Sequence, residues 1–458
     1  MRKFVWRWSY WSRLWALTSI LLAALLGSTG SVCAADGDLD PLWNSDGVAT
    51  IGVTDTIYKG NRIALQCDGK VVVAGIANGA GESADLAVVR FNVDGSLDSS
   101  FGTAGLFAIN VGDLGSSGLD LAIQPDGKIV VVGTSYNDII SGGTKFLVIR
   151  LTTGGVPDST FSGDGIYDFN FDSPSWAQAV AIQDDGRIVI VGRTNNLTAM
   201  AVARLTTTGA LDSSFSGDGK VLVDFTMGDD EAWDVAIQED GRILVVGDAN
   251  TGVGSVAAVV RLLDNGTLDP TFGSGGGGGA AINFGYDSFG RAIALQNDGK
   301  IVIAGITDSA TSVAVARLTT GGILDPTFSG DGMVTRDFNF GPDEGWDVAM
   351  QGDGRIVVAG SGYVDGLHYV ALLRFTTDGT PDPTLGGYGY SLVSFGFDAF
   401  GRGVAIQPYD HKIVATGFVQ TDSSESSLTV IRTIGDTNLI FAADFECGGF
   451  SGWSSATP

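Results

Sequence analysis

Short runs of β-branched and other apolar residues, each bounded by turn residues, recur along almost the whole chain. The run 129–132, for example, is Ile-Val-Val-Val and follows the turn pair Asp126-Gly127. β-Branched side chains suit a pleated strand, and Asp-Gly between two such runs favours a tight hairpin because glycine adopts positive φ without strain. The pattern therefore predicts antiparallel strands with little helix.

The runs belong to one unit that recurs seven times at intervals of 55–59 residues. A motif of the form apolar-Ala-apolar-Gln-x-Asp-Gly-Lys/Arg is centred on Gln66, Gln124, Gln183, Gln238, Gln296, Gln351 and, in degenerate form, Gln407. Each Gln is followed by an arginine, namely Arg90, Arg150, Arg204, Arg261, Arg317, Arg374 or Arg432. Each Gln is preceded by a Leu/Pro-Asp-x-x-Phe element whose aspartates are Asp40, Asp98, Asp158, Asp212, Asp269, Asp325 and Asp382. Three markers in constant order indicate a tandem repeat.

Each unit is expected to form four strands. In the second repeat they are expected over 119–124, 128–133, 146–151 and 166–171. Four antiparallel strands per unit, repeated four to eight times, build a β-propeller. Seven units therefore predict seven blades.

The two ends of the array predict how the ring closes. A strand of the fourth kind, 47–53, precedes the first complete unit, and the last unit stops after a strand of the third kind, 428–433. The N-terminal strand can complete the last blade, which removes the exposed edges of an open array. We expect an all-β fold, a single seven-bladed β-propeller of four-stranded blades closed by the N-terminal strand. A right-handed β-solenoid is the alternative, and it would need capping segments.

Residues 1–34 are predicted to be a secretory signal peptide. Basic residues at positions 2, 3, 7 and 13 precede an apolar stretch over 14–26, and small residues lead to Ala34. This stretch falls short of the ~20 residues that span a membrane, and Cys33 lacks the preceding Leu of a lipoprotein signal. An uncleaved anchor and lipidation are therefore the less favoured alternatives. We expect cleavage after Ala34, a secreted protein and no transmembrane anchor in its mature form.

Aspartate dominates the charge of the chain. Only six of the 52 acidic residues are Glu, and the formal net charge is −26. Aspartate favours turns because its short carboxylate accepts hydrogen bonds from nearby backbone N–H groups. Such an acidic surface, with no basic stripe, repels phosphate backbones, so no nucleic-acid partner is expected.

The repeats, for example 123–133 leading to Arg150-Leu151 and then Asp158-Ser-Thr-Phe161, resemble the delta-60 repeat of bacterial exported proteins. The resemblance covers residues ~38–434 and implies a β-propeller-type repeat at the bacterial cell surface or outside the cell, without implying an activity. The last repeats depart from the pattern. Leu385 replaces the usual Phe, and His411, with an inserted residue, replaces the turn glycine.

The repeats are assigned to 35–435 and a C-terminal tail to 436–458. The tail reads Phe-Glu-x-Gly and then Trp-Ser, with Cys447 after Glu446. It resembles a short C-terminal segment of other exported bacterial proteins. A sorting or surface-retention segment and a last strand packed on the ring stay open as alternatives.

Catalytic and metal-binding motifs are sparse. The two histidines, His368 and His411, have no metal-ligand spacing, and neither a nucleophile elbow nor a phosphate-binding loop occurs. No cofactor is expected. Calcium is the one metal considered, because 92–98 and 216–219 form oxygen-rich turns, although they lack the bidentate Glu of an EF-hand loop. The seven repeated Asp and Arg residues are interpreted as scaffold, with each Asp capping a turn or pairing with the Arg of its blade.

Positions that differ among the blades are better candidates for ligand binding. Five or seven residues ahead of the marker Gln, several blades carry an aromatic residue or an arginine: Trp176, Trp233, Phe289, Arg291, Trp346, Phe400 and Arg402. In a propeller these positions lie beside the central channel, where aromatic planes and guanidinium groups suit sugars or acidic ligands. Wedging of the aromatics between blades is the alternative interpretation.

We therefore expect a monomeric, secreted or surface-displayed propeller that acts as a non-catalytic binding or structural module, with a glycan or a cell-envelope protein as partner. A hydrolase or lyase acting on an extracellular polymer is the alternative, and it would require carboxylates that converge at one place on the channel. A disulfide between Cys67 and Cys447 is a further hypothesis, because the tail of a closed ring lies near the first blade.

Overall fold

The computed structural model describes residues 36–434, except 53–55, 80–83, 138–142, 172–173, 195–198, 226–228, 286, 308–311, 339–340, 409 and 422–424. The described residues form 28 β-strands and contain no helix. No helix that could span a membrane occurs in this part of the chain.

Six blades consist of four consecutive antiparallel strands each. Blades 1 and 2 are β2 (Thr56–Leu65), β3 (Val71–Gly79), β4 (Asp85–Phe91), β5 (Leu106–Ile109) and β6 (Gly115–Ile123), β7 (Ile129–Tyr136), β8 (Lys145–Leu151), β9 (Ile166–Phe169). Blades 3 and 4 are β10 (Ser175–Ile182), β11 (Ile188–Thr194), β12 (Met200–Leu205), β13 (Lys220–Val223) and β14 (Asp230–Ile237), β15 (Ile243–Asn250), β16 (Ser255–Leu262), β17 (Gly279–Ile282). Blades 5 and 6 are β18 (Ser288–Leu295), β19 (Ile301–Thr307), β20 (Ser312–Leu318), β21 (Met333–Arg336) and β22 (Glu344–Met350), β23 (Ile356–Val364), β24 (Leu367–Phe375), β25 (Tyr390–Val393).

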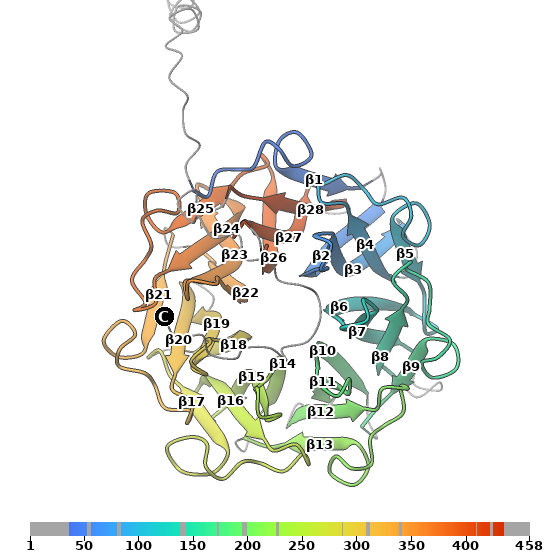
Figure 1. The fold of residues 1–458 in the computed structure, drawn as a ribbon. Coiled ribbons are helices and arrows are strands. Elements are labelled where there is room, and N and C mark those ends of the chain that lie inside the picture. Colours follow the sequence, from blue (N-terminus) through green and yellow to red (C-terminus); the bar gives the residue numbers. More distant parts are fainter. Residues whose placement is uncertain are drawn as a thin grey trace, which may run out of the picture. The chain divides into compact units, whose positions relative to one another are not determined.

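The two ends of the array share blade 7. Its strands are β26 (Asp398–Ile406), β27 (Ile413–Gln420), β28 (Ser426–Arg432) and β1 (Val48–Ile51). β1 pairs antiparallel with β28, with Val48 opposite Ile431. The N-terminal strand therefore completes the last blade, and the seven blades form the closed ring seen in Figure 1. This confirms the predicted seven-bladed propeller.

The innermost strand of each blade contacts the innermost strand of the next blade, so that β2, β6, β10, β14, β18, β22 and β26 surround the centre of the ring (Figure 1). The second strand of each blade is buried on both faces, because each cluster of buried apolar residues draws on two adjacent blades. A strand packed on both faces needs no polar alternation. Val130, Val131 and Val132 are all fully buried for this reason.

The repeated Arg and Asp pair within every blade. Arg204 Nε, for example, donates to Asp212 Oδ2 at 2.8 Å, and its guanidinium lies 4.9 Å from the ring of Phe215. The same arginine bonds the carbonyl of Asp264 in the next blade. In blade 7 the aspartate is Asp40, which precedes β1 and lies 2.9 Å from Arg432 Nε. Arg204 also donates to Gln183 Oε1 at 3.3 Å, so in this blade the three sequence markers form one buried contact that reaches the next blade, as the scaffold interpretation expects.

The two departures from the repeat have local structural consequences. Leu385 is fully buried in the position that Phe occupies in five blades and Trp43 in blade 7, so Arg374 lacks the aromatic ring that lies beneath the other marker arginines. His411 adopts φ 54°, the left-handed conformation that glycine adopts in the other Asp-Gly turns. His411 therefore preserves the geometry of the turn in a backbone conformation that is uncommon for residues other than glycine.

Candidate functional site

The innermost strand of every blade contains one extra residue at a β-bulge. The register against the second strand shifts at this residue in all seven blades. A bulge redirects its extra side chain away from the regular alternation. The bulged residues are Asn61, Leu119, Gln178, Trp233, Arg291, Trp346 and Arg402.

A glycine on the second strand makes room for this bulge. A Cβ on Gly417 would collide with the carbonyl oxygen of Phe400, and one on Gly75 would collide with that of Lys59. The repeated glycine of the second strand is therefore required by the close approach of the bulged strand.

All seven bulged residues line one pocket of about 290 Å³. The other lining residues are Lys59, Arg62 and Phe418. We call these ten residues the channel pocket. The pocket draws on all seven blades, and its lining contains four cations, three aromatic rings and no carboxylate.

The aromatic wall of the channel pocket alternates indole rings with guanidinium groups. Arg291 lies 3.9 Å from the ring centroid of Trp233, and Arg402 lies 3.9 Å from that of Trp346. Trp233 and Trp346 meet edge to face, with ring centroids 6.2 Å apart. Each indole therefore has a cation over one face, an arrangement that stabilises the cation through the ring quadrupole.

Lys59 and Arg402 are the two cations of the channel pocket that have no carboxylate within ion-pair distance among the described residues. Lys59 Nζ lies 4.8 Å from the ring of Phe418, and Arg402 lies 5.8 Å from the same ring. Burial lowers the pKa of Lys59, and the positive charge of Arg402 lowers it further. Burial also lowers the pKa of Arg402, with Glu344 opposing this shift and Arg291 adding to it.

Arg62 binds three aspartates from alternate blades. Its guanidinium nitrogens lie 3.4 Å from Asp120, 3.4 Å from Asp234 and 2.6 Å from Asp347, which belong to blades 2, 4 and 6. At most 13% of each of these four side chains is exposed. One cation thus ties together four inner strands across the channel.

Each of the three carboxylates also joins its blade to the next one. Asp120 accepts the N–H groups of Leu121 and Val180, at 2.7 and 2.8 Å. Asp234 accepts those of Val235 and Ile293, and Asp347 accepts those of Val348 and Val404. Blades 3, 5 and 7 carry small residues at the equivalent position, namely Ala179, Ala292 and Gly403. Acidic and small residues therefore alternate from blade 2 to blade 7, and Arg62 occupies the equivalent position in blade 1.

Burial sets the protonation of this cluster. It raises the pKa of Asp120 to about 7, with Arg62 opposing the shift and Asp234 adding to it. Burial likewise raises the pKa of Asp347 to about 6 against the opposing charge of Arg62. One guanidinium cannot fully compensate three buried carboxylates, so the cluster binds protons more readily than isolated aspartates do.

Three carboxylates close to the channel pocket are not among its lining residues. Asp248 Oδ1 lies 3.0 Å from Arg291, Glu231 binds Arg193, and Glu344 accepts the indole N–H of Trp346 at 2.7 Å. Burial raises the pKa of Asp248 to about 6, opposed by Arg291. Asp248 and Glu344 therefore hold lining side chains in place, whereas Glu231 binds Arg193 outside the lining.

The channel pocket includes four of the seven candidate residues from the sequence: Trp233, Arg291, Trp346 and Arg402. The other three, which lie two residues before a bulge, are not among its lining residues. Trp176 stacks under Arg193, Phe289 lies 5.3 Å from Arg291, and Phe400 stacks on Phe418. Phe289 and Phe400 thus support lining residues, whereas Trp176 belongs to a separate contact.

The sequence interpretation missed Lys59, Arg62 and Phe418 of the lining, and it missed Asp120, Asp234 and Asp347. Asn61, Leu119 and Gln178 share the column five residues ahead of Gln, but they are neither aromatic nor cationic. Four residues ahead of the marker Gln, aspartates alternate with small residues from blade 2 to blade 7. This alternation is the signal in the sequence that could have indicated the Arg62 cluster.

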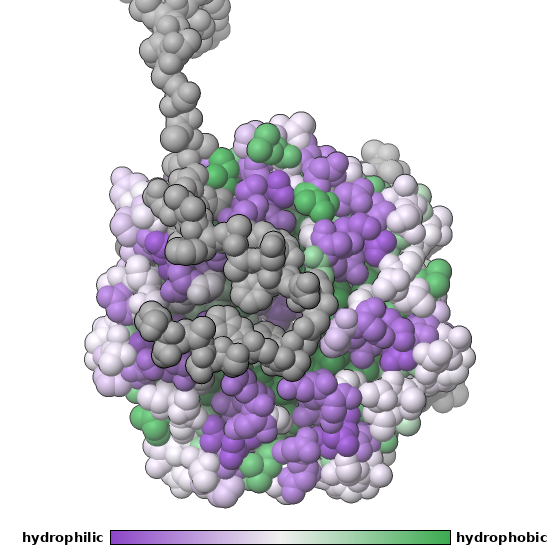
Figure 2. Space-filling model, viewed as in Figure 1, coloured by the Kyte–Doolittle hydropathy of each residue, from purple (hydrophilic) through white to green (hydrophobic). Residues whose placement is uncertain are grey.

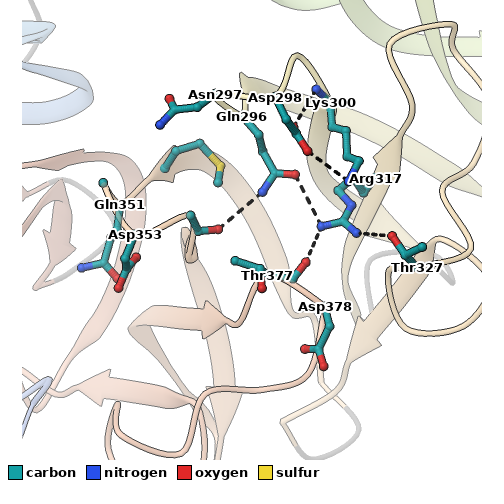
Figure 3. A pocket seen from close by; sticks show the side chains of 13 residues that line it. Gln296, Asn297, Asp298, Lys300, Arg317, Thr327, Gln351, Asp353, Thr377 and Asp378 are labelled. Atoms are coloured by element: carbon teal, nitrogen blue, oxygen red, sulfur yellow. Dashed lines mark hydrogen bonds and ion pairs between the residues drawn. The ribbon is translucent and has the colours of Figure 1, made fainter. Parts of the chain in front are cut away.

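A second cavity, of about 490 Å³, lies between blades 5 and 6 (Figure 3). Its polar groups are largely repeat markers that bind one another: Arg317 contacts Gln296, Thr327 and the carbonyl of Thr377. This cavity therefore belongs to the inter-blade scaffold. Figure 2 shows hydrophilic side chains on every blade of the face in view, with hydrophobic ones scattered between them.

The oxygens of the turns considered for calcium serve the turns themselves. Asp94 accepts the N–H and hydroxyl of Ser96, and Asp218 accepts the N–H of Lys220. In the described part of the chain, no group of three or more His, Cys, Asp or Glu side chains is arranged to hold a metal ion.

Cys67 is disulfide-bonded. The other two cysteines, Cys33 and Cys447, lie outside the described residues, as do the predicted signal peptide and tail. The pairing with Cys447 remains a prediction.

The fold and the channel define the class as a seven-bladed β-propeller built from tandem repeats. Six repeats match the family model "Domain of unknown function (DUF5122) beta-propeller", over residues 66–101, 124–161, 183–215, 238–272, 296–328 and 351–385. Six of the seven repeats therefore match a β-propeller repeat family. No curated protein matches it.

Solved structures resemble the chain in fold. A catalytically inactive virginiamycin B lyase from Staphylococcus aureus with quinupristin has 11% identity and a TM-score of 0.51, covering 84% of this chain and 98% of its own. A protein of unknown function from Dyadobacter fermentans has 11% identity and a TM-score of 0.48, covering 85% and 100%. The polysaccharide lyase Uly1 has 12% identity and a TM-score of 0.47, covering 82% and 90%. At these identities the likeness concerns the fold alone.

Proposed function

We propose that this chain is an exported, non-catalytic binding module whose channel pocket recognises a glycan or a cell-envelope partner. The observation that carries the proposal is the convergence of seven bulged side chains, one from each blade, on a single pocket without lining carboxylates. A repeat scaffold does not require the bulged position to be aromatic or cationic, since Asn61, Leu119 and Gln178 occupy it in three blades. Its specialisation in the other four blades supports a recognition role.

The finer parts of the proposal come from the sequence. The repeats are proposed to be delta-60 repeats, residues 1–34 a cleaved signal peptide, and 436–458 a sorting or retention segment. The mature protein is proposed to be a monomer at the bacterial surface or outside the cell. N-terminal sequencing of the protein from the producing cell tests the cleavage after Ala34.

Enzymatic action on an extracellular polymer receives less support. Three carboxylates do converge on the channel, but Asp120, Asp234 and Asp347 each accept two backbone N–H groups and share Arg62. None of them lines the channel pocket. A general acid or base must reach the reacting group, and these oxygens are already engaged.

A glycan and cell-envelope polysaccharide array tests the proposed function. The protein is applied with calcium and with a chelator, and Trp233→Ala and Trp346→Ala are compared with Trp176→Ala, whose aromatic ring lies outside the pocket lining. Binding that is lost in the first two variants and kept in the third supports the proposal. Absence of binding, or equal binding by all variants, contradicts it. Cleavage of a bound polymer, measured as new chain ends, would support the enzymatic alternative.

A further inference from the structure

We propose, resting on the proposed function, that the channel pocket recognises an acidic saccharide and holds its carboxylate, sulfate or phosphate group between Lys59 and Arg402. The four cations of the channel pocket differ in their acidic partners. Arg62 has three aspartates and Arg291 has Asp248, whereas Lys59 and Arg402 have no carboxylate within ion-pair distance among the described residues. Both line the pocket.

Lys59 and Arg402 lie close to the same aromatic ring. Both lie over the ring of Phe418, at 4.8 and 5.8 Å, so they approach the same part of the pocket. Partly buried like charges that share a site repel one another and lose hydration, which is costly unless an anion compensates them. The lowered pKa of Lys59 has these two causes, burial and the charge of Arg402.

The aromatic rings of the channel pocket already have a neighbouring group on one face. A neutral sugar is held mainly by an open aromatic face. Arg291, however, covers one face of Trp233, and Arg402 covers one face of Trp346. Phe418 has Phe400 stacked on it at 4.9 Å. One face of each ring is thus already covered, whereas the N–H donors of guanidinium and ammonium in the lining favour anionic oxygens.

The charge of the channel pocket contrasts with that of the whole chain. The formal net charge of the chain is −26, and the neighbouring acids Asp248, Glu231 and Glu344 are held by Arg291, Arg193 and Trp346. A site whose charged lining residues are all cations selects an anion by position, although the protein as a whole repels it. Asn61, Leu119 and Gln178 complete the wall and could contact the sugar hydroxyls or ring.

Matched polymers test this inference by titration calorimetry on the full chain. Polygalacturonate and a sulfated polysaccharide are compared with carboxyl-reduced polygalacturonate, which has the same backbone without the charge, and with inorganic sulfate and phosphate. We expect an acidic polymer to bind at least about tenfold more tightly than the neutral one, the gain of a charge-assisted hydrogen bond. Binding should weaken as salt rises.

The variants Lys59→Gln and Arg402→Gln should each weaken acidic-polymer binding about tenfold or more. Arg336→Gln is the matched control, because Arg336 also lies over an aromatic ring, that of Tyr390 at 4.8 Å, but belongs to the outermost strand of blade 5. Thermal unfolding checks that each variant is folded. If Arg402→Gln does not fold, the binding of acidic polymer by Lys59→Gln alone tests the inference.

Equal binding of neutral and acidic polymers, or unchanged binding by Lys59→Gln, overturns the inference and leaves the proposed function standing. Binding of inorganic sulfate or phosphate as tightly as of the polymer overturns the saccharide assignment. Absence of any polymer binding overturns the inference, and together with a negative array it overturns the proposed function as well.

Discussion

Arg432, at the end of the last strand, donates its Nε to Asp40, which lies 392 positions earlier in the chain, at 2.9 Å. Arg432 also reaches the carbonyl of Val93 in blade 1. The pair occupies the same place as the Arg–Asp pairs inside the other blades, but it joins the two ends of the array. The closure of the ring therefore depends on a contact that every other blade makes locally.

Asp40→Ala should lower the free energy of unfolding by about 3–5 kcal/mol, because it leaves the buried Arg432 without its carboxylate. Chemical denaturation measures the loss. The control Asp46→Ala removes an exposed turn carboxylate near the same strand and should have an effect below about 1 kcal/mol. An equally small effect of Asp40→Ala would show that closure relies on the β1–β28 pairing alone.

Arg62→Leu should destabilise the ring in a pH-dependent manner. Removing the cation leaves three buried carboxylates uncompensated, with an expected cost of about 3–5 kcal/mol at about pH 8. The pKa values of Asp120 and Asp347 are raised to about 7 and about 6, above the pKa of an unfolded Asp. The stability that these two groups contribute is therefore present at low pH and is lost as the pH rises through these two values. The cost should therefore shrink at about pH 5.

Denaturation curves at the two pH values measure the difference. Arg193→Leu, which removes a partly exposed partner of Glu231, should show a small cost that changes little with pH. A cost of Arg62→Leu that is equal at both pH values would contradict the proton uptake assigned to the cluster.

The scaffold aspartates should make the protein acid-sensitive. Burial raises the pKa of Asp158, but bonds from Thr160 and the charges of Arg150 and Lys128 outweigh it and lower the pKa to about 2. A depressed pKa contributes stability above the unfolded value of about 3.8, and this stability is lost as pH falls towards about 2. Asp158→Asn should therefore flatten the fall in unfolding free energy between about pH 4 and 2, and an unchanged slope would count against this assignment.

The aromatic ring beneath the scaffold arginine can be tested with the substitution that the chain itself contains. Phe215→Ala should cost about 3–5 kcal/mol because it empties a fully buried position. Phe215→Leu should cost clearly less, since Leu385 fills the equivalent position in blade 6. Thermal or chemical unfolding measures the loss of unfolding free energy in the two variants. Equal losses would show that the contact of the ring with Arg204, rather than the volume of the side chain, determines the cost.

The disulfide of Cys67 should join the first blade to the tail. Non-reducing peptide mapping of the mature protein is expected to recover a cross-linked peptide that contains Cys67 and Cys447, because cleavage after Ala34 would remove Cys33. Cys67→Ser should lower stability by about 2–4 kcal/mol through the unfolded chain that the bond constrains. A free Cys447 thiol would disprove this pairing.

The sequence alone was sufficient for the architecture, because a propeller is built from contacts that repeat with the chain. The strand runs, the Asp-Gly turns and the markers Gln, Arg and Asp recur in constant order, and each describes a contact within a blade or with the next one. The unpaired strand before the first unit predicted the closure through β1. Local pattern and neighbour packing were enough for these features.

The channel pocket was only partly predictable. The distance ahead of the marker Gln indicates Trp233 and Arg402, which lie five residues ahead of it. The same criterion also indicates Trp176 and Phe400, which lie seven residues ahead of it and do not line the pocket. A bulge decides between them, because its extra residue turns towards the channel while the regular alternation resumes on either side. The bulge depends on pairing with a second strand and on a glycine opposite it.

Only the tertiary structure brought Arg62 together with Asp120, Asp234 and Asp347. Their positions in the repeat are equivalent, so the sequence could show that they share a column but not that one side chain reaches three others across a ring. That reach depends on how closely seven inner strands approach the axis, a distance set by the packing of all the blades at once. The sequence thus determined the repeating blade and its closure, while the packed ring decided which side chains meet at its centre.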